Sequence, residues 1–382
     1  MYLLEHDAKS LLAAHHITIP PGCLVSQADQ PLPPLPAGPW MVKGQISAGG
    51  RGKAGIIKKA NTVEEIKSHC EHIIGRTVKG HRVQSVRIEQ QISGGAEAYC
   101  SLLLDAAAGG IRVIMATQGG MEIETLPPEA IQTAVAAPTL EALTQCIAEL
   151  TAHLPAPYGQ ALSEVGLHLA KRFLDSEALL IEINPLFVRS DSSWVVGDAK
   201  YVTDDSALER QAEILHLLKT RSSAYPEAAL KFEHGCDYVV VDPDGEIGLL
   251  TTGAGLSMML VDELRAVGLK PYNFLDVRTG GLRGETQRLV KVLQWIHQGR
   301  HIKVLLINIF AGITELGEFS KLLVSALAEV PELNVPVVAR LVGNGLPAAR
   351  EVLSAAGIAL YPDLDEALVE VKKHLAAAGE KK

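Results

Sequence analysis

From residue 235 to the C-terminus, the sequence repeats one pattern: a short apolar strand, a loop that contains glycine, and a helix. Such alternation is typical of a parallel α/β sheet with helices on its faces. In these sheets, ligands bind beyond the carboxyl ends of the strands, where loops and helix N-termini meet. The glycine loops at 253–255, 278–284, 311–313 and 343–345 are therefore candidates for an anion pocket. The same glycines also suit tight strand-to-helix turns, and the two interpretations are compatible.

Residues 1–234 follow a different pattern, in which strands succeed one another along the chain. Val83–Gln91, Tyr99–Asp105 and Arg112–Thr117 are expected to be strands, and Met1–His16 is expected to be a helix. This order predicts a mixed α+β region and not a second doubly wound sheet. A chain of 382 residues has room for two or three domains. We therefore expect one part at 1–234, itself made of two lobes, and a second at 235–382.

A hairpin is predicted near the middle of the chain. Two apolar strands, Leu179–Val188 and Trp194–Asp198, flank a short polar run. Side chains alternate across a strand, so Glu182 and Asn184 project from one face, whereas Ile181 and Ile183 enter the core. A polar face of this kind is also what an edge hairpin presents to solvent.

The register of this hairpin suggests a metal site. If the turn centres on Asp191, Asn184 lies opposite Asp198 and Glu182 lies opposite Lys200. Opposed side chains are about 5 Å apart at Cβ. An amide oxygen and a carboxylate at that separation suit a Mg²⁺ ion that is held mainly by water and phosphate.

A glycine-rich loop follows the predicted strand Trp40–Lys43. The segment GQISAGGRGKAG contains five glycines together with Arg51 and Lys53. Glycines let backbone N–H groups approach a phosphate, and the two cations add charge. The segment has neither the P-loop spacing nor the dinucleotide-binding fingerprint. It is either a phosphate-binding loop or a flexible surface loop, and its place after a strand favours phosphate.

Composition excludes several classes of partner. The net charge of −9 argues against nucleic acid or an anionic membrane. No run approaches the roughly 20 apolar residues of a membrane helix, and Glu5 and Asp7 stand where a signal peptide would be basic. The five cysteines form no CxxC pair, which suits buried thiols in a reducing compartment. We therefore expect a cytoplasmic protein.

Several segments together resemble a known family. In chain order they are MVKGQISAGGRGKAG, IEQQISGGAE, GGMEIE, LLIEINPL, GDAK, NFLDV and INIFAGI. They resemble the β subunit of succinyl-CoA synthetase, and also the equivalent parts of malate–CoA ligase and ATP-citrate lyase, over essentially the whole chain. The resemblance implies an N-terminal ATP-grasp region followed by a flavodoxin-like, parallel α/β CoA-ligase domain.

The resemblance also implies roles for the residues that match its motifs. Those implied to contact the nucleotide are Lys43, Gly50, Arg51, Gly52, Glu89, Ile92 and Glu97, the first four at the phosphates and the others at the base and ribose. By themselves, Glu89 and Glu97 would suit turn and edge carboxylates. Asn184 and Asp198 would bind Mg²⁺, and Glu182 would steady a phosphohistidine loop from a partner.

In the C-terminal domain, the resemblance implies that Thr252, Arg278, Gly312, Ile313 and Thr314 lie at the carboxylic acid. The helix after Ala311 would point its N-terminus at the phosphohistidine, whose charge its dipole would favour.

The acid pocket departs from the family pattern in three loops. Thr252 replaces the usual asparagine, Arg278 and Arg283 enter a loop that is normally three glycines, and Ala311 replaces a glycine. The nucleotide and metal motifs are intact, so we expect the ATP chemistry to be kept and the acid to differ. A malate-like hydroxy-dicarboxylate or a sulfonate-bearing acid such as sulfoacetate would fit. The alternative is drift around an ordinary succinate site.

The resemblance implies an ADP-forming acid–CoA ligase that uses ATP, CoA and Mg²⁺. A histidine and the CoA site would belong to an α subunit, in an αβ or (αβ)₂ assembly. Pro20 resembles ATP-using and not GTP-using relatives. Two other functions stay open. A ligase that joins a carboxylate to an amine is disfavoured by the flavodoxin-like domain, and a degenerate regulatory subunit is disfavoured by the intact Lys43, Asn184 and Asp198.

Overall fold

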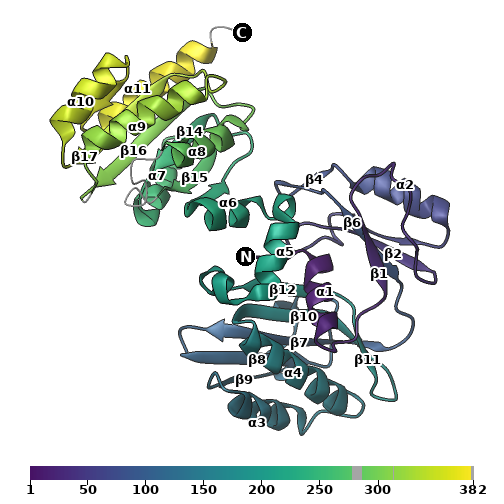
Figure 1. Cartoon of the computed structure of the whole chain (residues 1–382). Coiled ribbons are helices and arrows are strands. Elements are labelled where there is room, and N and C mark those ends of the chain that lie inside the picture. The colour runs from purple at the N-terminus through teal and green to yellow at the C-terminus, as the bar shows by residue number, and fades with distance from the viewer. Residues whose placement is uncertain (278–285, 313, 380–382) are drawn as a thin grey trace. The chain divides into compact units, whose positions relative to one another are not determined.

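The computed structural model describes residues 1–277, 286–312 and 314–379. The chain forms two compact units, Met1–Ala224 and Tyr225–Lys382 (Figure 1). Helix α6 (Pro226–His234) contacts strand β13 (Asp237–Val240) and so belongs to the second unit. The boundary between the units therefore lies before α6, whereas the sequence predicts it after residue 234, at the end of this helix. Arg278, Arg283 and Ile313, which are predicted site residues or pocket changes, lie outside the described residues.

The smaller sheet of the first unit is antiparallel, in the order β1-β6-β2-β3. Its strands are β1 (Gly22–Val25), β2 (Trp40–Gly44), β3 (Ile57–Ala60) and β6 (Val86–Gln90). Helix α2 (Val63–Ile73) packs on it and buries Ile66 and Cys70. Thr62 caps this helix by accepting from the Glu65 N–H at 3.2 Å, as its sequence predicts. A short hairpin, β4 (Thr77–Val78) with β5 (His81–Arg82), precedes β6.

The larger sheet of the first unit is also antiparallel, in the order β11-β10-β7-β8-β9, with β12 paired to β10. Its strands are β7 (Ala96–Asp105), β8 (Gly110–Ala116), β9 (Ile131–Ala136), β10 (Ala178–Val188), β11 (Trp194–Val196) and β12 (Ala199–Thr203). Helices α3 (Leu140–Thr151) and α4 (Tyr158–Asp175) pack against it (Figure 1). The other α-helices of this unit are α1 (Glu5–Ala14) and α5 (Ala212–Thr220). The mixed α+β organisation expected for the N-terminal part is confirmed.

The predicted hairpin register is confirmed. Glu182 pairs with Lys200, and the Asn184 N–H donates to the Asp198 carbonyl at 3.3 Å. Strand β10 is an inner strand because β7 pairs with its other edge, whereas β11 and β12 pair only with β10 and form the edge of the sheet. The hairpin therefore does lie at a sheet edge, which both interpretations of its polar face allow. The returning strand also breaks into β11 and β12 at Gly197 and Asp198.

The second unit is built on a parallel sheet in the order β14-β16-β17-β18. The strands are β14 (Ile247–Thr251), β16 (Val304–Ala311), β17 (Val337–Gly343) and β18 (Ala359–Tyr361). Strand β15 (Asn273–Asp276) runs beside β14, where the Asn273 side chain bonds the Leu249 N–H and carbonyl at 2.9 and 2.8 Å. The resulting order, second–first–third–fourth–fifth, is flavodoxin-like, as expected. Strand β13 is the exception to the repeated pattern because it pairs antiparallel with β15.

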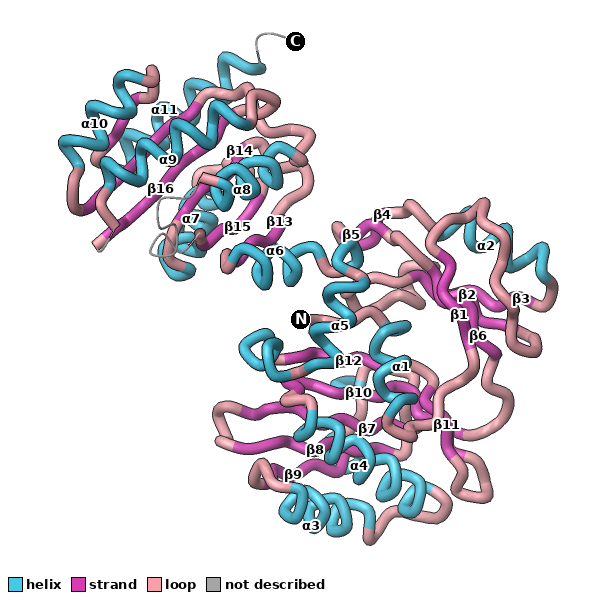
Figure 2. The backbone as a smooth tube through the Cα atoms, viewed as in Figure 1, coloured by secondary structure: helices cyan, strands magenta, loops and turns pink. Residues whose placement is uncertain are grey.

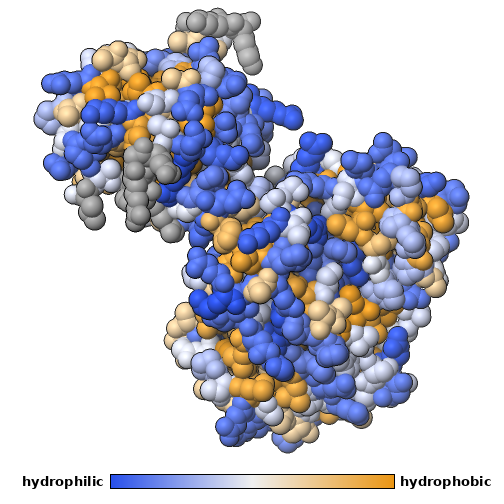
Figure 3. Space-filling view, viewed as in Figure 1, coloured by the Kyte–Doolittle hydropathy of each residue, from blue (hydrophilic) through white to orange (hydrophobic). Residues whose placement is uncertain are grey.

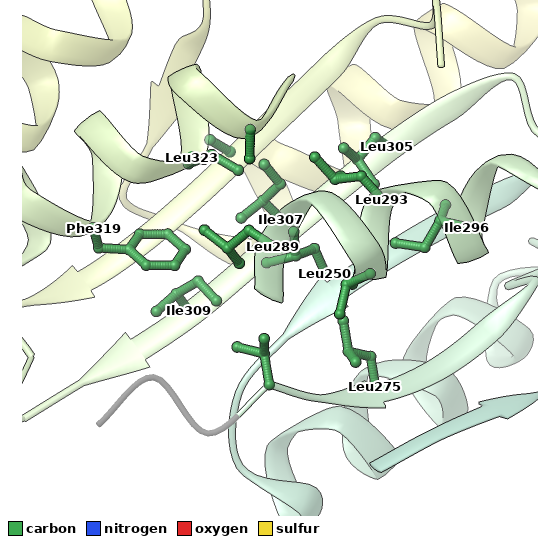
Figure 4. Close-up of a cluster of buried hydrophobic side chains, with 14 of the residues drawn as sticks. Leu250, Leu275, Leu289, Leu293, Ile296, Leu305, Ile307, Ile309, Phe319 and Leu323 are labelled. Carbon is green, nitrogen blue, oxygen red and sulfur yellow. The ribbon is translucent and has the colours of Figure 1, made fainter. Parts of the chain in front are cut away.

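Helices cover both faces of this sheet (Figure 2). They are α7 (Ala254–Ala266) and α11 (Leu364–Gly379) on one face, and α8 (Gln287–His297), α9 (Leu316–Glu329) and α10 (Leu346–Ala355) on the other. Figure 4 shows Ile307 and Ile309 of β16 in the same buried cluster as Leu289 and Phe319. Alternate residues of β16, such as Leu306, face the α7 and α11 side.

Within the described residues, no helix combines the length and apolar character that a bilayer crossing needs. Figure 3 shows hydrophilic and hydrophobic side chains interspersed over the viewed face of each unit. The cytoplasmic location stays a prediction.

The core of the second unit yields a first prediction. Ile307 is fully buried, so Ile307→Ala should lower the free energy of unfolding by about 3 kcal/mol by leaving a cavity. Hydrogen exchange of peptides from β14 and β16 measures this loss of protection. Val369→Ala is a control, because Val369 is 53% exposed, and it should change stability by less than about 0.5 kcal/mol. Equal protection in both variants would contradict the assignment of Ile307 to the core.

Candidate functional site

Four of the predicted nucleotide and metal residues meet in one group of buried charges. Lys43 on β2, Arg51 in the glycine loop, Glu89 on β6 and Asp198 after β11 come together from distant parts of the first unit. Three further residues complete what we call the charge cluster, which consists of Glu5, Lys9, Lys43, Arg51, Arg87, Glu89 and Asp198. Only Asp198 has a side chain with substantial exposure, at 29%.

Glu5, on helix α1, is the centre of the cluster. Its Oε1 forms an ion pair with Lys9 at 2.8 Å and accepts from Lys43 at 2.9 Å, and its Oε2 accepts from Arg51 at 2.6 Å. Burial raises the pKa of a carboxyl, but the three cations outweigh that effect and hold the pKa of Glu5 well below its usual range. Burial lowers the pKa of Lys43, but the carboxylates of Glu5, Glu89 and Asp198 outweigh that effect and raise it. The pairs are therefore ionised at neutral pH.

Glu89 is bonded to three cations as well. Its carboxylate accepts from Lys9 at 2.8 Å and from Arg87 at 2.6 Å and forms an ion pair with Lys43 at 2.7 Å. The side chain is 2% exposed. Arg87 also donates to the carbonyl of Pro20 at 3.0 Å. The predicted contact of Glu89 with a nucleotide stays a prediction, and in this conformation its oxygens are occupied by protein cations.

Arg51 connects the glycine loop to the hairpin. Its Nη2 donates to both carboxylate oxygens of Asp198 at 2.6 Å, while its Nη1 bonds Glu5. Asp198 lies in the break between β11 and β12, where its side chain meets Arg51. Gly197 is required at the break, because a Cβ there would lie 2.5 Å from the Phe187 ring and 2.8 Å from the Pro185 carbonyl oxygen.

Asn184 and Glu97 lie beside a second glycine loop, residues 119–124. The Asn184 Oδ1 accepts from the Gly120 N–H at 2.7 Å, and its Nδ2 donates to the Met121 carbonyl at 2.8 Å. A Cβ on Gly120 would lie 1.7 Å from the Glu97 carboxylate, so the loop packs directly on that side chain. The GGMEIE motif thus places its backbone at the predicted metal residue.

Glu182 is half-buried on the same strand as Asn184 and faces Lys200 across the ladder. Burial raises the pKa of its carboxyl, Lys200 opposes that shift, and Asp198 and Glu124 add to it. Gly50 and Gly52 stand on either side of Arg51, and Ile92 lies in the turn between β6 and β7. Their predicted nucleotide contacts stay predictions.

In the second unit, the described acid-pocket residues lie at the carboxyl end of the parallel sheet. Thr252 follows β14, and Gly312 and Thr314 follow the neighbouring β16, whose Asn308 is the register partner of Thr251. Thr252 is 6% exposed, and the next residue, Gly253, has its N–H bonded to Asp276 at 2.8 Å. The fold therefore gathers these residues at the carboxyl end of the parallel strands, as predicted from the repeated pattern.

The N-terminus of α9 has acceptors within the chain. The Glu315 carboxylate accepts from the Glu318 N–H at 2.7 Å, and the Asn344 carbonyl accepts from the Leu316 N–H at 2.9 Å. Gly345 allows this contact, because a Cβ on it would lie 1.6 Å from Glu315. The predicted phosphohistidine contact of this helix stays a prediction, and Glu315 already places a negative charge there.

Glu5, Lys9 and Arg87 are missing from the sequence-based site. The helix Met1–His16 is predicted, and Glu5 and Lys9 have the i,i+4 spacing of a helical ion pair. That spacing is usual on solvent-exposed helices, so it carries no signal of burial. Only contacts with residues far along the chain, such as Gly197, reveal their role.

Comparisons with known proteins agree with this arrangement. Residues 2–188 match the model of an ATP-grasp domain, and residues 250–374 match that of a CoA-ligase. The chain is 35% identical to the "Succinate--CoA ligase [ADP-forming] subunit beta" of Chloroflexus aurantiacus strain J-10-fl, over 93% of each chain. It is also 35% identical to "Succinate--CoA ligase [ADP-forming] subunit beta 2" of Archaeoglobus fulgidus, over 92% of each. The chain belongs to the succinate–CoA ligase β-subunit family.

Family membership confirms the resemblance and the fold expected from it, an ATP-grasp domain followed by a CoA-ligase domain. It also identifies the chain as part of an acid–thiol ligase. A solved ATP citrate lyase from Methanothrix soehngenii, in complex with citrate and coenzyme A, has the same fold at 19% identity. That likeness covers 94% of this chain and 95% of the other, with a TM-score of 0.71.

The 119–124 loop gives a second prediction. A Cβ on Gly119 would lie 2.2 Å from the Ala98 carbonyl oxygen, a backbone atom that cannot move cheaply. Gly119→Ala should therefore shift the loop away from Asn184 and lower the melting temperature of the first unit by about 5 °C. Differential scanning calorimetry measures this melting temperature. Gly52→Ala is the control for stability, since a Cβ there meets no atom within 4 Å. An unchanged midpoint in Gly119→Ala would contradict the close packing.

His6 gives a third prediction, on pH. Burial and the nearby Arg87 guanidinium lower the pKa of His6 to about 4, below the roughly 6.5 of an unfolded chain. The unfolded state therefore binds a proton more readily. This contribution to stability is complete above pH 6.5 and declines as pH falls from 6.5 to 4, by about 2 kcal/mol at pH 5.

In the wild type, Nη1 of Arg87 lies 2.9 Å from Nδ1 of His6. His6→Asn keeps an acceptor for Arg87 but removes the titrating group. Denaturant unfolding at pH 7 and pH 5 should show a loss in the wild type that is larger than the loss in His6→Asn by about 2 kcal/mol. Trp295→Phe in both proteins restricts the fluorescence signal to Trp40 and Trp194 of the first unit. Identical losses in the two proteins would contradict the half-buried, neutral state of His6.

Proposed function

We propose that the chain is the nucleotide-binding β subunit of an ADP-forming carboxylic acid–CoA ligase, which converts ATP, acid and CoA into acyl-CoA, ADP and phosphate. The observation that carries the proposal is the meeting of Lys43 and Arg51, from the glycine-rich strand and loop, with Asp198 of the hairpin. Phosphoryl transfer depends chiefly on positioning and charge neutralisation. The Chloroflexus relative is named for this reaction with succinate.

In this function, Lys43 and Arg51 neutralise the nucleotide phosphates, and the backbone of Gly50 and Gly52 approaches them without a side chain in the way. Arg51 would exchange its contact with Asp198 for one with phosphate. The preference of Arg for bidentate oxygen pairs makes either partner suitable. Glu89, Ile92 and Glu97 lie along the segment proposed to hold the base and ribose.

Asn184 and Asp198 are proposed to hold Mg²⁺. Both present hard oxygen atoms, and the hairpin register places them across from each other. The described residues contain no group of three or more His, Cys, Asp or Glu side chains arranged for a metal. Two protein oxygens suit Mg²⁺ because it keeps water and phosphate oxygens as its other ligands. The ion would supply neutralisation of the phosphate charge.

The partner is proposed to be an α subunit that carries the CoA site and a histidine that is phosphorylated in turn, in an αβ or (αβ)₂ assembly. Glu182 would orient that histidine. Its raised pKa follows chiefly from partial burial, and a partly buried carboxylate stabilises an imidazolium more strongly than an exposed one. The match of residues 250–374 to the CoA-ligase model favours CoA over an amine as the acceptor.

The acid is proposed to be other than succinate alone, either a malate-like hydroxy-dicarboxylate or a sulfonate-bearing acid. Support comes from Thr252, which is buried at the sheet edge with Gly312 and Thr314 and is shorter than the asparagine expected there. Arg278, in the same proposed pocket, would contact the additional anionic group.

The fourth prediction tests this function. The chain, co-purified with its α partner, should release ADP in a reaction that depends on both CoA and an acid. Succinate, malate, itaconate, citrate and sulfoacetate form the panel. Asp198→Asn should lower turnover by at least about 100-fold, because it removes one charge at the proposed metal and phosphate site. Native mass spectrometry verifies that this variant still binds the α partner.

Thr252→Asn is the variant for the acid. It should raise kcat/KM for succinate relative to the preferred acid by about tenfold, by restoring an amide hydrogen bond. An unchanged acid preference would contradict the role of Thr252 and leave an ordinary succinate enzyme. If none of the acids supports ADP release, the ligase function itself is contradicted.

A further inference from the structure

We infer that Lys9, which does not reach the nucleotide site, positions Lys43 and Arg51 for nucleotide binding by holding the two buried carboxylates that these cations must release. This inference rests on the proposed function. It assigns a role to helix α1, which the charge cluster places between the smaller sheet and the hairpin.

The contacts of Lys9 are complete within the protein. Its Nζ donates to the two carboxylate oxygens of Glu89 at 2.9 and 2.8 Å and to the carbonyl of Gly197 at 2.8 Å, and it forms an ion pair with Glu5 at 2.8 Å. Three acceptors require three N–H donors, which only the ammonium form has. The side chain is 0% exposed, so a bound nucleotide cannot touch it without displacing other groups.

Lys43 has the same three acceptors. Its Nζ lies 2.9 Å from Glu5, 2.7 Å from Glu89 and 2.7 Å from the carbonyl of Gly197. The difference is access, since the side chain of Lys43 is 9% exposed and that of Lys9 is fully buried. Two lysines therefore share one set of acceptors, and Lys43 is the one that opens to the site.

This duplication lets Lys43 move at low cost. If Lys43 turns to a phosphate, Lys9 continues to neutralise both Glu5 and Glu89, so neither buried carboxylate is left without a cation. If Arg51 turns to a phosphate, Lys9 likewise continues to neutralise Glu5, which both cations contact. Without Lys9, the two carboxylates would hold Lys43 and Arg51 more tightly, and nucleotide binding would have to break those pairs.

Charge balance leads to the same expectation. The charge cluster contains four cations, which are Lys9, Lys43, Arg51 and Arg87, and three carboxylates, which are Glu5, Glu89 and Asp198. The neighbouring Asp7 and Arg221 form an ion pair of their own. The excess positive charge favours an anionic ligand, and loss of Lys9 would cancel it.

The experiment measures MgATP binding by isothermal titration calorimetry on the complex with the α partner. Lys9→Met should raise the Kd of MgATP about tenfold, which corresponds to about 1.4 kcal/mol. KM for the acid and for CoA should stay unchanged. The decisive variant is the double substitution Glu5→Gln with Lys9→Met, which restores the excess of one cation and should return the Kd to within about threefold of the wild type.

A merely structural role of Lys9 gives a different result, because two core substitutions would then weaken binding at least as much as one. Arg172→Met is the matched control. Arg172 is also a buried cation, 4% exposed, but it bonds His15 and Glu213 and no residue of the charge cluster. It should lower the melting temperature and leave the Kd of MgATP unchanged. Lys9→Arg keeps the charge, so it should bind MgATP better than Lys9→Met. If Lys9→Met folds poorly, Lys9→Arg is compared with the wild type instead and should bind MgATP with a similar Kd.

The two proposals fail in different ways. If the wild-type complex binds no MgATP, the proposed function is wrong. If the wild type binds and Lys9→Met binds within about twofold of it, the positioning role is wrong while the function stands. A double variant weaker than Lys9→Met would also overturn the inference.

Discussion

The ion pairs that Glu5 forms with Lys9, Lys43 and Arg51 are the interaction on which the first unit depends. Removing charges from water costs several kcal/mol per ion, and attraction repays that cost only when geometry is close and every donor has a partner. The cluster meets this condition with contacts of 2.6–2.9 Å at Glu5. Its members come from α1, the smaller sheet, the glycine loop and the hairpin, so all four must be in place together.

This constraint also prepares the chemistry. Cations that are already fixed by buried carboxylates need little reorganisation when a phosphate arrives, which is the basis of electrostatic catalysis. The cost is competition, because the same carboxylates hold the cations back. Asp198 illustrates both effects, since it fixes Arg51 while belonging to the proposed metal site.

Local periodicity explains what the sequence predicts well. The register of Glu182 with Lys200 follows from a two-residue period and a polar turn, both of which are local. The parallel sheet of the second unit follows from its repeated strands and glycine loops. The motif matches predict that Lys43, Arg51 and Asp198 share a site, and the structure brings them together.

What the sequence does not predict depends on distant partners. At the break between β11 and β12, the Gly197 carbonyl accepts from two lysines that lie far away in the chain. The inner position of β10 depends on β7, which is made long before it. A helix with Glu5 and Lys9 one turn apart looks the same whether water or a buried carboxylate surrounds it. Motif spacing alone therefore finds Lys43 but not Lys9.

The long separation between Lys9 and Gly197 has a consequence for protein synthesis. Lys9 of helix α1 is made early, but its acceptor at Gly197 is made 188 residues later. At about 5–20 residues per second, that interval lasts roughly 10–40 s. Throughout it, Lys9 and Lys43 lack the Gly197 carbonyl as an acceptor, and Arg51 lacks Asp198. The ribosome must therefore deliver the hairpin before the first unit closes, so translation speed across that interval sets the earliest moment at which a nucleotide site exists.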